Sequence, residues 1–168
     1  MDPITFIKFN VPKGAIIFIN YRFSLTEYFN PSEDKHAAIY LGKIKKENLI
    51  SCKRSFDENE VWAIEASYKN GVNLITLDEL LKGALNIKIF ILDDELSEPK
   101  MSIAADISLK FIGMPYGFGS NHIYCFKLVA ESYSYLGITM PTYNILGKKI
   151  YLSQSFTHSG HWKKIYES

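Results

Sequence analysis

The sequence has little of what marks several broad protein classes. Its 168 residues include only two cysteines, Cys52 and Cys125, too few for a secreted module held together by disulfide bonds. The N-terminus has an early acid, Asp2, and no apolar run behind a basic start, so it is not typical of a signal peptide. No segment approaches the ~20 apolar residues of a membrane span. We therefore expect an intracellular chain with reduced thiols and no transmembrane segment.

An excess of charge of either sign is also missing. Nineteen Lys and Arg residues stand against 18 Asp and Glu residues, and the formal net charge is +1. No long-range field favours a polyanion, so nucleic acid is not a predicted partner. The composition is 47% hydrophobic and 14% aromatic, which is enough apolar material for an ordinary folded core. The length predicts a single domain over residues 1–168.

Strand-like segments dominate the first half of the chain, which we expect to start with β structure. Short apolar runs rich in β-branched residues are bounded by turn residues, and Asn70-Gly71 predicts a tight turn between two of them. The predicted strands span residues 14–20, 36–42, 61–66, 72–76 and 87–92.

Helical spacing is found later in the chain. Residues 78–83 predict a helical turn or two with Asp78 as the capping acid, and a longer helix should run from Ser97 to just before Gly113. A third helix begins at Cys125, with apolar residues at three- and four-residue steps before a terminal glycine. Residues 145–156 have no clear period. The prediction is an α+β fold, with strands first and helices mainly in the second half.

Cys125 is a candidate nucleophile because of its position. The first turn of a helix offers free N–H groups and a partial positive charge, which favour the thiolate. The alternative is that Cys125 is a small apolar residue in the core, the commoner fate of a lone cysteine. For Cys52, in a short apolar segment with no helix behind it, the core interpretation is preferred.

A thiol nucleophile needs a base, and His36 is the candidate at the start of a predicted strand with small neighbours. A surface histidine at a strand entry is the alternative. His122 is only three residues from Cys125, and His158 and His161 lie in an irregular tail. The residues alone therefore rank His36 only slightly ahead.

Glu65 lies in an apolar strand, on the face opposite Trp62 and Ile64. Such an acid either faces solvent or is buried with a hydrogen-bond partner. Orienting the second ring nitrogen of His36 would explain its burial. Both interpretations stay open at this point.

Other kinds of site find no support in the sequence. Apart from His158 and His161, no spacing is typical of metal ligands. The glycines of residues 116–119 lack the lysine and hydroxyl of a phosphate-binding loop, and there is no Gly-x-Ser-x-Gly elbow. No cofactor and no metal are predicted.

One segment closely resembles the catalytic-cysteine region of the NlpC/P60 family. Ile112-Gly-Met-Pro-Tyr-Gly-Phe-Gly-Ser-Asn-His-Ile-Tyr-Cys125 contains a Gly-x-Pro-Tyr and a glycine-rich loop before the cysteine, and a helix that ends in Gly137-Ile138 follows. In the ordinary family order the histidine follows the cysteine, whereas His36 precedes it here. The order is that of the circularly permuted branch, which includes bacterial YiiX-like proteins, relatives of lecithin-retinol acyltransferase and a poxvirus protein.

The resemblance to the permuted branch covers nearly the whole chain and is greatest for the poxvirus member. It implies a papain-like fold in which an antiparallel sheet packs against the helix that carries the cysteine at its N-terminus. It also implies that Cys125, His36 and Glu65 form the catalytic set and that Tyr116 assists the oxyanion site. The usual Asp-Cys-Ser is replaced here by Tyr-Cys-Phe over residues 124–126.

The resemblance implies a cysteine hydrolase or acyltransferase that acts on an amide, isopeptide or ester bond through a thioester. The substrate, a peptide or a lipid, is not identified, nor is the oligomeric state. The alternative function is a catalytically silent module that engages a host protein or lipid. A membrane-surface enzyme would need an exposed apolar or basic patch, and only Lys148, Lys149, Lys163 and Lys164 leave that open. The implied location is the host cytoplasm or the virion.

Overall fold

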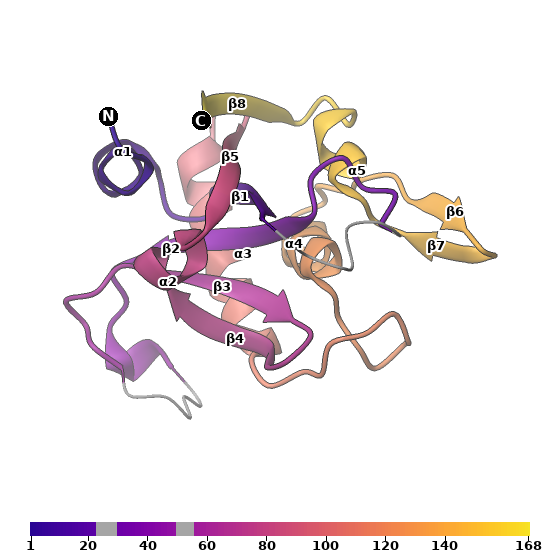
Figure 1. Cartoon of the computed structure of the whole chain (residues 1–168), viewed down its shortest axis with the longest axis horizontal. Helices are drawn as coiled ribbons and strands as arrows, with labels where there is room; N and C mark the ends of the chain where they lie inside the picture. The colour runs from indigo at the N-terminus through magenta and orange to yellow at the C-terminus, as the bar shows by residue number, and fades with distance from the viewer. Residues whose placement is uncertain (23–29, 50–55) are drawn as a thin grey trace.

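A computed structural model describes residues 1–22, 30–49 and 56–168 (Figure 1). Its centre is a six-stranded antiparallel sheet in the order β4-β3-β2-β1-β5-β8, and a separate two-stranded hairpin joins β6 to β7. The strands are β1 (Ile16–Tyr21), β2 (His36–Gly42), β3 (Trp62–Ser67), β4 (Gly71–Thr76), β5 (Ala84–Leu92), β6 (Tyr143–Ile145), β7 (Lys148–Ile150) and β8 (Trp162–Glu167).

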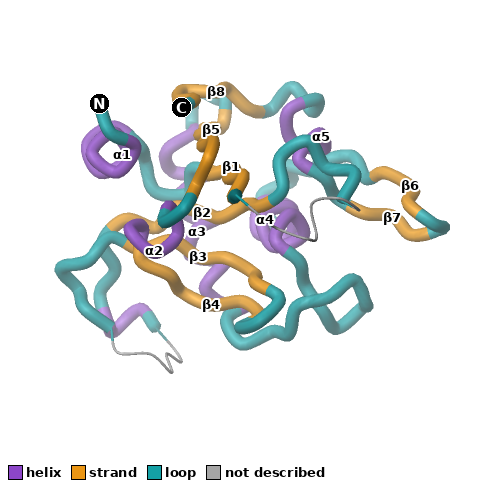
Figure 2. The backbone as a smooth tube through the Cα atoms, viewed as in Figure 1, coloured by secondary structure: helices purple, strands orange, loops and turns teal. Residues whose placement is uncertain are grey.

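The helices pack around this sheet (Figure 2). Helices α3 and α4 pack against each other and against β2, while α2 contacts β3, β4 and α1. The helices are α1 (Pro3–Asn10), α2 (Leu77–Leu81), α3 (Ser97–Ser108), α4 (Cys125–Ser134) and α5 (Ser153–Thr157), with short 3-10 helices at Lys46–Asn48 and Leu109–Phe111. This α+β arrangement confirms the predicted fold class, including the helix that begins at Cys125.

The prediction that the chain starts with β structure is wrong, because α1 precedes β1. The Asp2 carboxylate accepts hydrogen bonds from the backbone N–H groups of Ile4 and Thr5 at 3.0 and 3.2 Å. Pro3 occupies the first turn, where its missing N–H costs nothing. Local capping therefore decides this helix.

The capping residue of α2 also differs from the prediction. The hydroxyl of Thr76 accepts a hydrogen bond from the N–H of Glu79 at 3.3 Å, so Thr76 and not Asp78 is the cap. Asp78 lies one residue inside the helix, in the first turn. A carboxylate there still interacts favourably with the helix N-terminus.

The C-terminal part holds more β structure than the sequence indicates. The unassigned residues 145–156 include β7 and most of α5, and β8 adds an edge strand beside β5. Strand β8 pairs Glu167 with Lys88 and Trp162 with Leu92. Because this pairing joins distant parts of the chain, the local pattern of β8 carries little trace of it.

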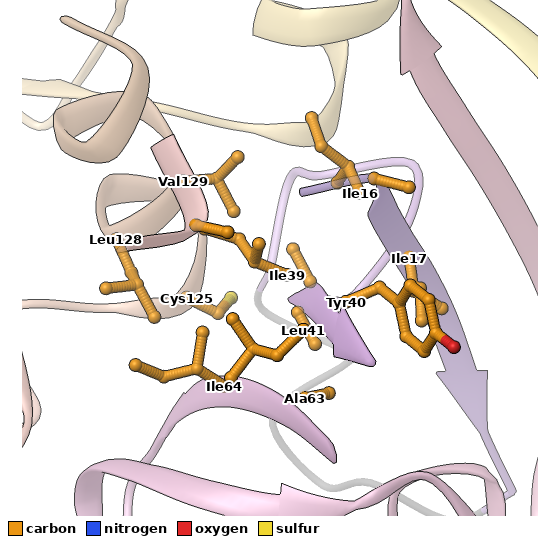
Figure 3. Packing of buried hydrophobic residues seen from close by; sticks show 14 of the residues in the cluster. Ile16, Ile17, Ile39, Tyr40, Leu41, Ala63, Ile64, Cys125, Leu128 and Val129 are labelled. Carbon is orange, nitrogen blue, oxygen red and sulfur yellow. The ribbon is translucent and has the colours of Figure 1, made fainter. Parts of the chain in front are cut away.

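The core fixes the N-terminal end of α4 against the sheet. Phe18 of β1 is fully buried and lies edge-on to Phe126 of α4, with ring centroids 5.8 Å apart. Figure 3 shows Cys125 among the buried side chains of this core, which include Ile39 of β2 and Ile64 of β3. Each such buried side chain contributes roughly 1.5–3 kcal/mol of burial free energy. The position of Cys125 is thus set by apolar packing.

Candidate active site

His36 and Glu65 meet on neighbouring strands of the sheet. Glu65 is paired in register with Ala38, and residues two apart on a strand share a face, so His36 is its diagonal neighbour. Nε2 of His36 lies 2.6 Å from Oε2 of Glu65, and Glu65 is only 7% exposed. The solvent-facing interpretation of Glu65 is therefore wrong. With Nε2 engaged by the carboxylate, Nδ1 is the nitrogen left to act on a second group.

The surroundings of His36 favour its charged form. Burial lowers the pKa of the ring, but hydrogen bonding to Cys125 and to Glu65, together with their negative charges, outweighs burial and raises the pKa to about 10. The ring thus interacts with both groups, although the three residues are far apart in the sequence. Only the fold brings them together.

Cys125 is the first residue of α4. Its side chain is buried, and the preceding residue, Tyr124, makes no side-chain cap on the helix. The N–H groups of the first turn are therefore open to another acceptor, and the helix dipole favours a negative charge at this end. A thiolate and, later, a substrate oxygen are the kinds of group that such an environment stabilises.

A buried polar network holds the segment that leads into His36. The Asp34 carboxylate, two residues before His36, accepts hydrogen bonds from Asn20 and Lys88, both at 3.0 Å. The backbone N–H of Asp34 donates to the hydroxyl of Ser153 at 2.9 Å. Contacts from β1, β5 and α5 thus fix the start of β2. This network orients the candidate base without touching it.

A cavity of about 1000 Å³ opens at the candidate triad. Its wall includes the three residues themselves and Tyr116, so the structure places all four predicted site residues around one space. The other lining side chains are mostly aromatic or aliphatic, namely Tyr21, Pro31, Ala66, Tyr68, Ile75, Phe118, Tyr124, Phe126, Ile145, Leu146, Ile150, Tyr151 and Leu152, with Asn30, Lys35, Ser67, Glu79 and Lys148 among them.

Tyr116 keeps its phenolic proton in this setting. Burial, and after it the charge of Cys125, raise the pKa of Tyr116 well above its ordinary value. The hydroxyl is therefore a hydrogen-bond donor over the whole physiological range. A donor on the wall that also carries the nucleophile suits an oxyanion site.

Residues outside the predicted catalytic set complete the site. Tyr124 stacks on Phe118 with ring centroids 4.6 Å apart, and its hydroxyl accepts a hydrogen bond from the N–H of Tyr151 at 2.7 Å. Tyr21 lies beside the His36 ring, with centroids 6.1 Å apart. The departure of the chain from Asp-Cys-Ser thus gives the thiol an aromatic neighbourhood. Only the position of Tyr124 next to the cysteine could have indicated this.

The competing histidines lie away from this centre. His122, His158 and His161 are all exposed, and none of them lines the cavity. Cys52 falls within residues 50–55, outside the described part of the chain. The described residues also contain no group of three or more His, Cys, Asp or Glu side chains that could hold a metal ion.

Comparisons with known proteins show the family of this chain. Residues 10–166 match the family of permuted papain-like amidases, YaeF/YiiX, C92. The chain belongs to this family. Protein OPG091 of variola virus (isolate Human/India/Ind3/1967) is 46% identical over 168 residues, which is 100% of this chain and 92% of that protein. Protein OPG091 of monkeypox virus and of vaccinia virus (strain Copenhagen) is 45% identical over the same shares.

A solved structure supports the permuted papain-like fold of this chain. The crystal structure of yiiX from Escherichia coli O157:H7, described as a metalloprotein, aligns with a TM-score of 0.71 over 94% of this chain and 97% of that one. At 15% identity this likeness shows the fold alone. The predicted resemblance to the permuted branch and its poxvirus member is confirmed. Membership of a papain-like amidase family favours cysteine-type hydrolysis or acyl transfer.

No helix of the described residues combines the length and the apolar character needed to cross a membrane.

Proposed function

We propose that this chain is a cysteine-dependent hydrolase or acyltransferase that cleaves an amide, isopeptide or ester bond through a thioester on Cys125. The observation that carries the proposal is the contact of His36 with two partners. Glu65 engages Nε2 at 2.6 Å, and Cys125 raises the pKa of the ring from the cavity side. A nucleophile, a base and a group that orients the base are the parts that this chemistry requires.

The first half of the reaction forms the thioester. Nδ1 of His36 takes the proton of the Cys125 thiol, and the thiolate attacks the carbonyl carbon of the substrate. The oxyanion accepts hydrogen bonds from the backbone N–H of Cys125 and from the hydroxyl of Tyr116. As the tetrahedral intermediate collapses, the imidazolium gives its proton to the leaving amine or alkoxide, and the acyl group remains on sulfur.

The second half removes the acyl group. His36 takes a proton from water or from another acceptor, whose oxygen or nitrogen attacks the thioester carbonyl. The thiolate leaves and is paired again with the imidazolium. Glu65 holds the ring in one tautomer throughout and stabilises its charge. The acceptor, the substrate and a host-cytoplasmic location stay predictions.

Trapping the acyl-enzyme tests this proposal. We expect p-nitrophenyl esters to add the mass of one acyl group to the chain in a Cys52→Ser background, and hydroxylamine to remove it. The adduct forms because a thioester is an obligatory intermediate. Intact-protein mass spectrometry of quenched samples makes the measurement, and the double variant Cys52→Ser, Cys125→Ser is the control.

Failure to find an adduct with either short or long acyl chains would count against turnover. An adduct that persists without Cys125 would show that another residue is acylated. In the first case the silent binding module becomes the better account of the cavity.

A further inference from the structure

The hairpin formed by β6 and β7 makes one wall of the cavity and carries an exposed apolar tip. Ile145, Leu146 and Ile150 of the hairpin line the cavity. Leu146 is 99% exposed and has a positive φ of 50°, next to Gly147. A leucine in the left-handed region costs free energy that a glycine or asparagine would avoid. The turn thus keeps an apolar side chain in water at a position that folding alone does not favour.

Exposed aromatic rings also lie among the residues that line the cavity. Tyr68 is 91% exposed and Phe118 is 51% exposed, and both line the cavity. A chain of ring contacts runs inward from this rim. The Tyr68 and Tyr116 centroids are 6.2 Å apart, those of Tyr116 and Phe118 are 6.2 Å apart, and Phe118 stacks on Tyr124 beside the nucleophile. Apolar surface is therefore continuous from the rim to Cys125.

Positive charge accompanies the apolar tip. Lys148 and Lys149 follow the turn and are both exposed, and residues 143–150 contain no acidic side chain. Figure 1 shows the β6–β7 hairpin extending away from the body of the molecule. Exposed apolar side chains next to lysines match the interface of an anionic bilayer, where the apolar groups enter the acyl boundary and the ammonium groups meet phosphates.

We propose that the rim formed by Leu146, Phe118, Tyr68, Lys148 and Lys149 docks on an anionic lipid surface. Leu146 enters the interface, and the two lysines contact headgroup phosphates. An acyl chain can then pass from the bilayer along the aromatic wall to the thiol. This docking places a membrane lipid in the substrate position. The role of the lipid as substrate rests on the proposed function, whereas the docking itself does not. The sequence alone shows no apolar patch because its members come from separate segments.

Vesicle sedimentation tests the docking without turnover. The full chain with Cys125→Ser is mixed with phosphatidylcholine vesicles, with and without phosphatidylserine, at low and high salt. We expect binding to the anionic vesicles, weakened by salt because the lysine contacts are screened. Leu146→Ser and the pair Lys148→Glu, Lys149→Glu should each lower the partition coefficient by about tenfold.

Matched controls come from other surfaces of the chain. Leu96 is 60% exposed and lies just before α3, and Lys163 and Lys164 are exposed on β8. Leu96→Ser and the pair Lys163→Glu, Lys164→Glu should leave vesicle binding unchanged, with circular dichroism as the check on folding.

Three results would overturn the docking proposal. They are no binding to anionic vesicles, equal binding to neutral ones, and equal loss in the control variants. Because the Cys125→Ser chain cannot form a thioester, vesicle binding is measured without turnover. The acyl-trapping experiment therefore tests the chemistry separately from the docking. A failure of trapping alone would overturn the chemistry and not the docking.

Discussion

Replacing His36 with alanine is expected to lower kcat/KM for acyl transfer by about 10²- to 10⁴-fold, the usual contribution of a positioned acid and base. The ring contacts the Cys125 thiol on one side and Glu65 on the other. Without it the thiol has no neighbouring base, and the leaving group has no proton donor. Release of p-nitrophenol from an ester that the native chain cleaves makes the measurement.

An exposed histidine provides the control for this substitution. His158 lies at the C-terminal end of α5, where its backbone N–H and not its ring completes the helix. His158→Ala should keep native activity, and thermal unfolding should show that both variants fold. A His36→Ala chain as active as the His158→Ala chain would show that the ring takes no part in the reaction.

Replacing Glu65 with glutamine is expected to move the alkaline limb of the activity profile to lower pH. The carboxylate helps to raise the pKa of His36 to about 10, and an amide can keep a hydrogen bond but not the charge. The limb should therefore shift from near pH 10 toward the ordinary histidine value of ~6.5. The measurement is kcat/KM against pH for both proteins, and coincident limbs would contradict the assigned contact.

The same substitution should alter how folding stability depends on pH. Because the pKa of His36 is raised in the folded state, its stabilising contribution is complete below ~6.5 and is lost as the pH rises through about 10. The loss should be larger in the native chain than with Glu65→Gln, because the amide carries no charge. Urea unfolding at several pH values in this window measures it, and equal slopes for both chains would speak against the ion pair.

Local patterns were enough to place the main elements of the site. The short apolar runs of residues 36–42 and 61–66, with the Asn70-Gly71 turn, predict β2, β3 and β4, and the spacing after Cys125 predicts α4. Local patterns do not predict the contact between His36 and Glu65, because it depends on the register between β2 and β3. A shift of one residue would turn Glu65 to the other face, and no local signal fixes that choice.

Features made by distant segments were not predictable. Strand β8 pairs with the outer edge of β5, and the wall of the cavity joins residues from β3, from the loop before α4 and from the β6–β7 hairpin. The tip at Leu146 has the backbone conformation typical of glycine, which its residue type does not indicate. The candidate residues were therefore visible in the sequence, whereas the space they surround was not.

The rate at which iodoacetamide alkylates Cys125 tests the central claim most directly. It should be followed between about pH 4 and pH 9, in the native chain and in His36→Ala, with Cys52→Ser in both. A working pair of thiolate and imidazolium predicts fast labelling at acid pH that collapses when the ring is removed. Slow labelling that rises in both chains only near the ordinary thiol pKa of ~8.5 would contradict it.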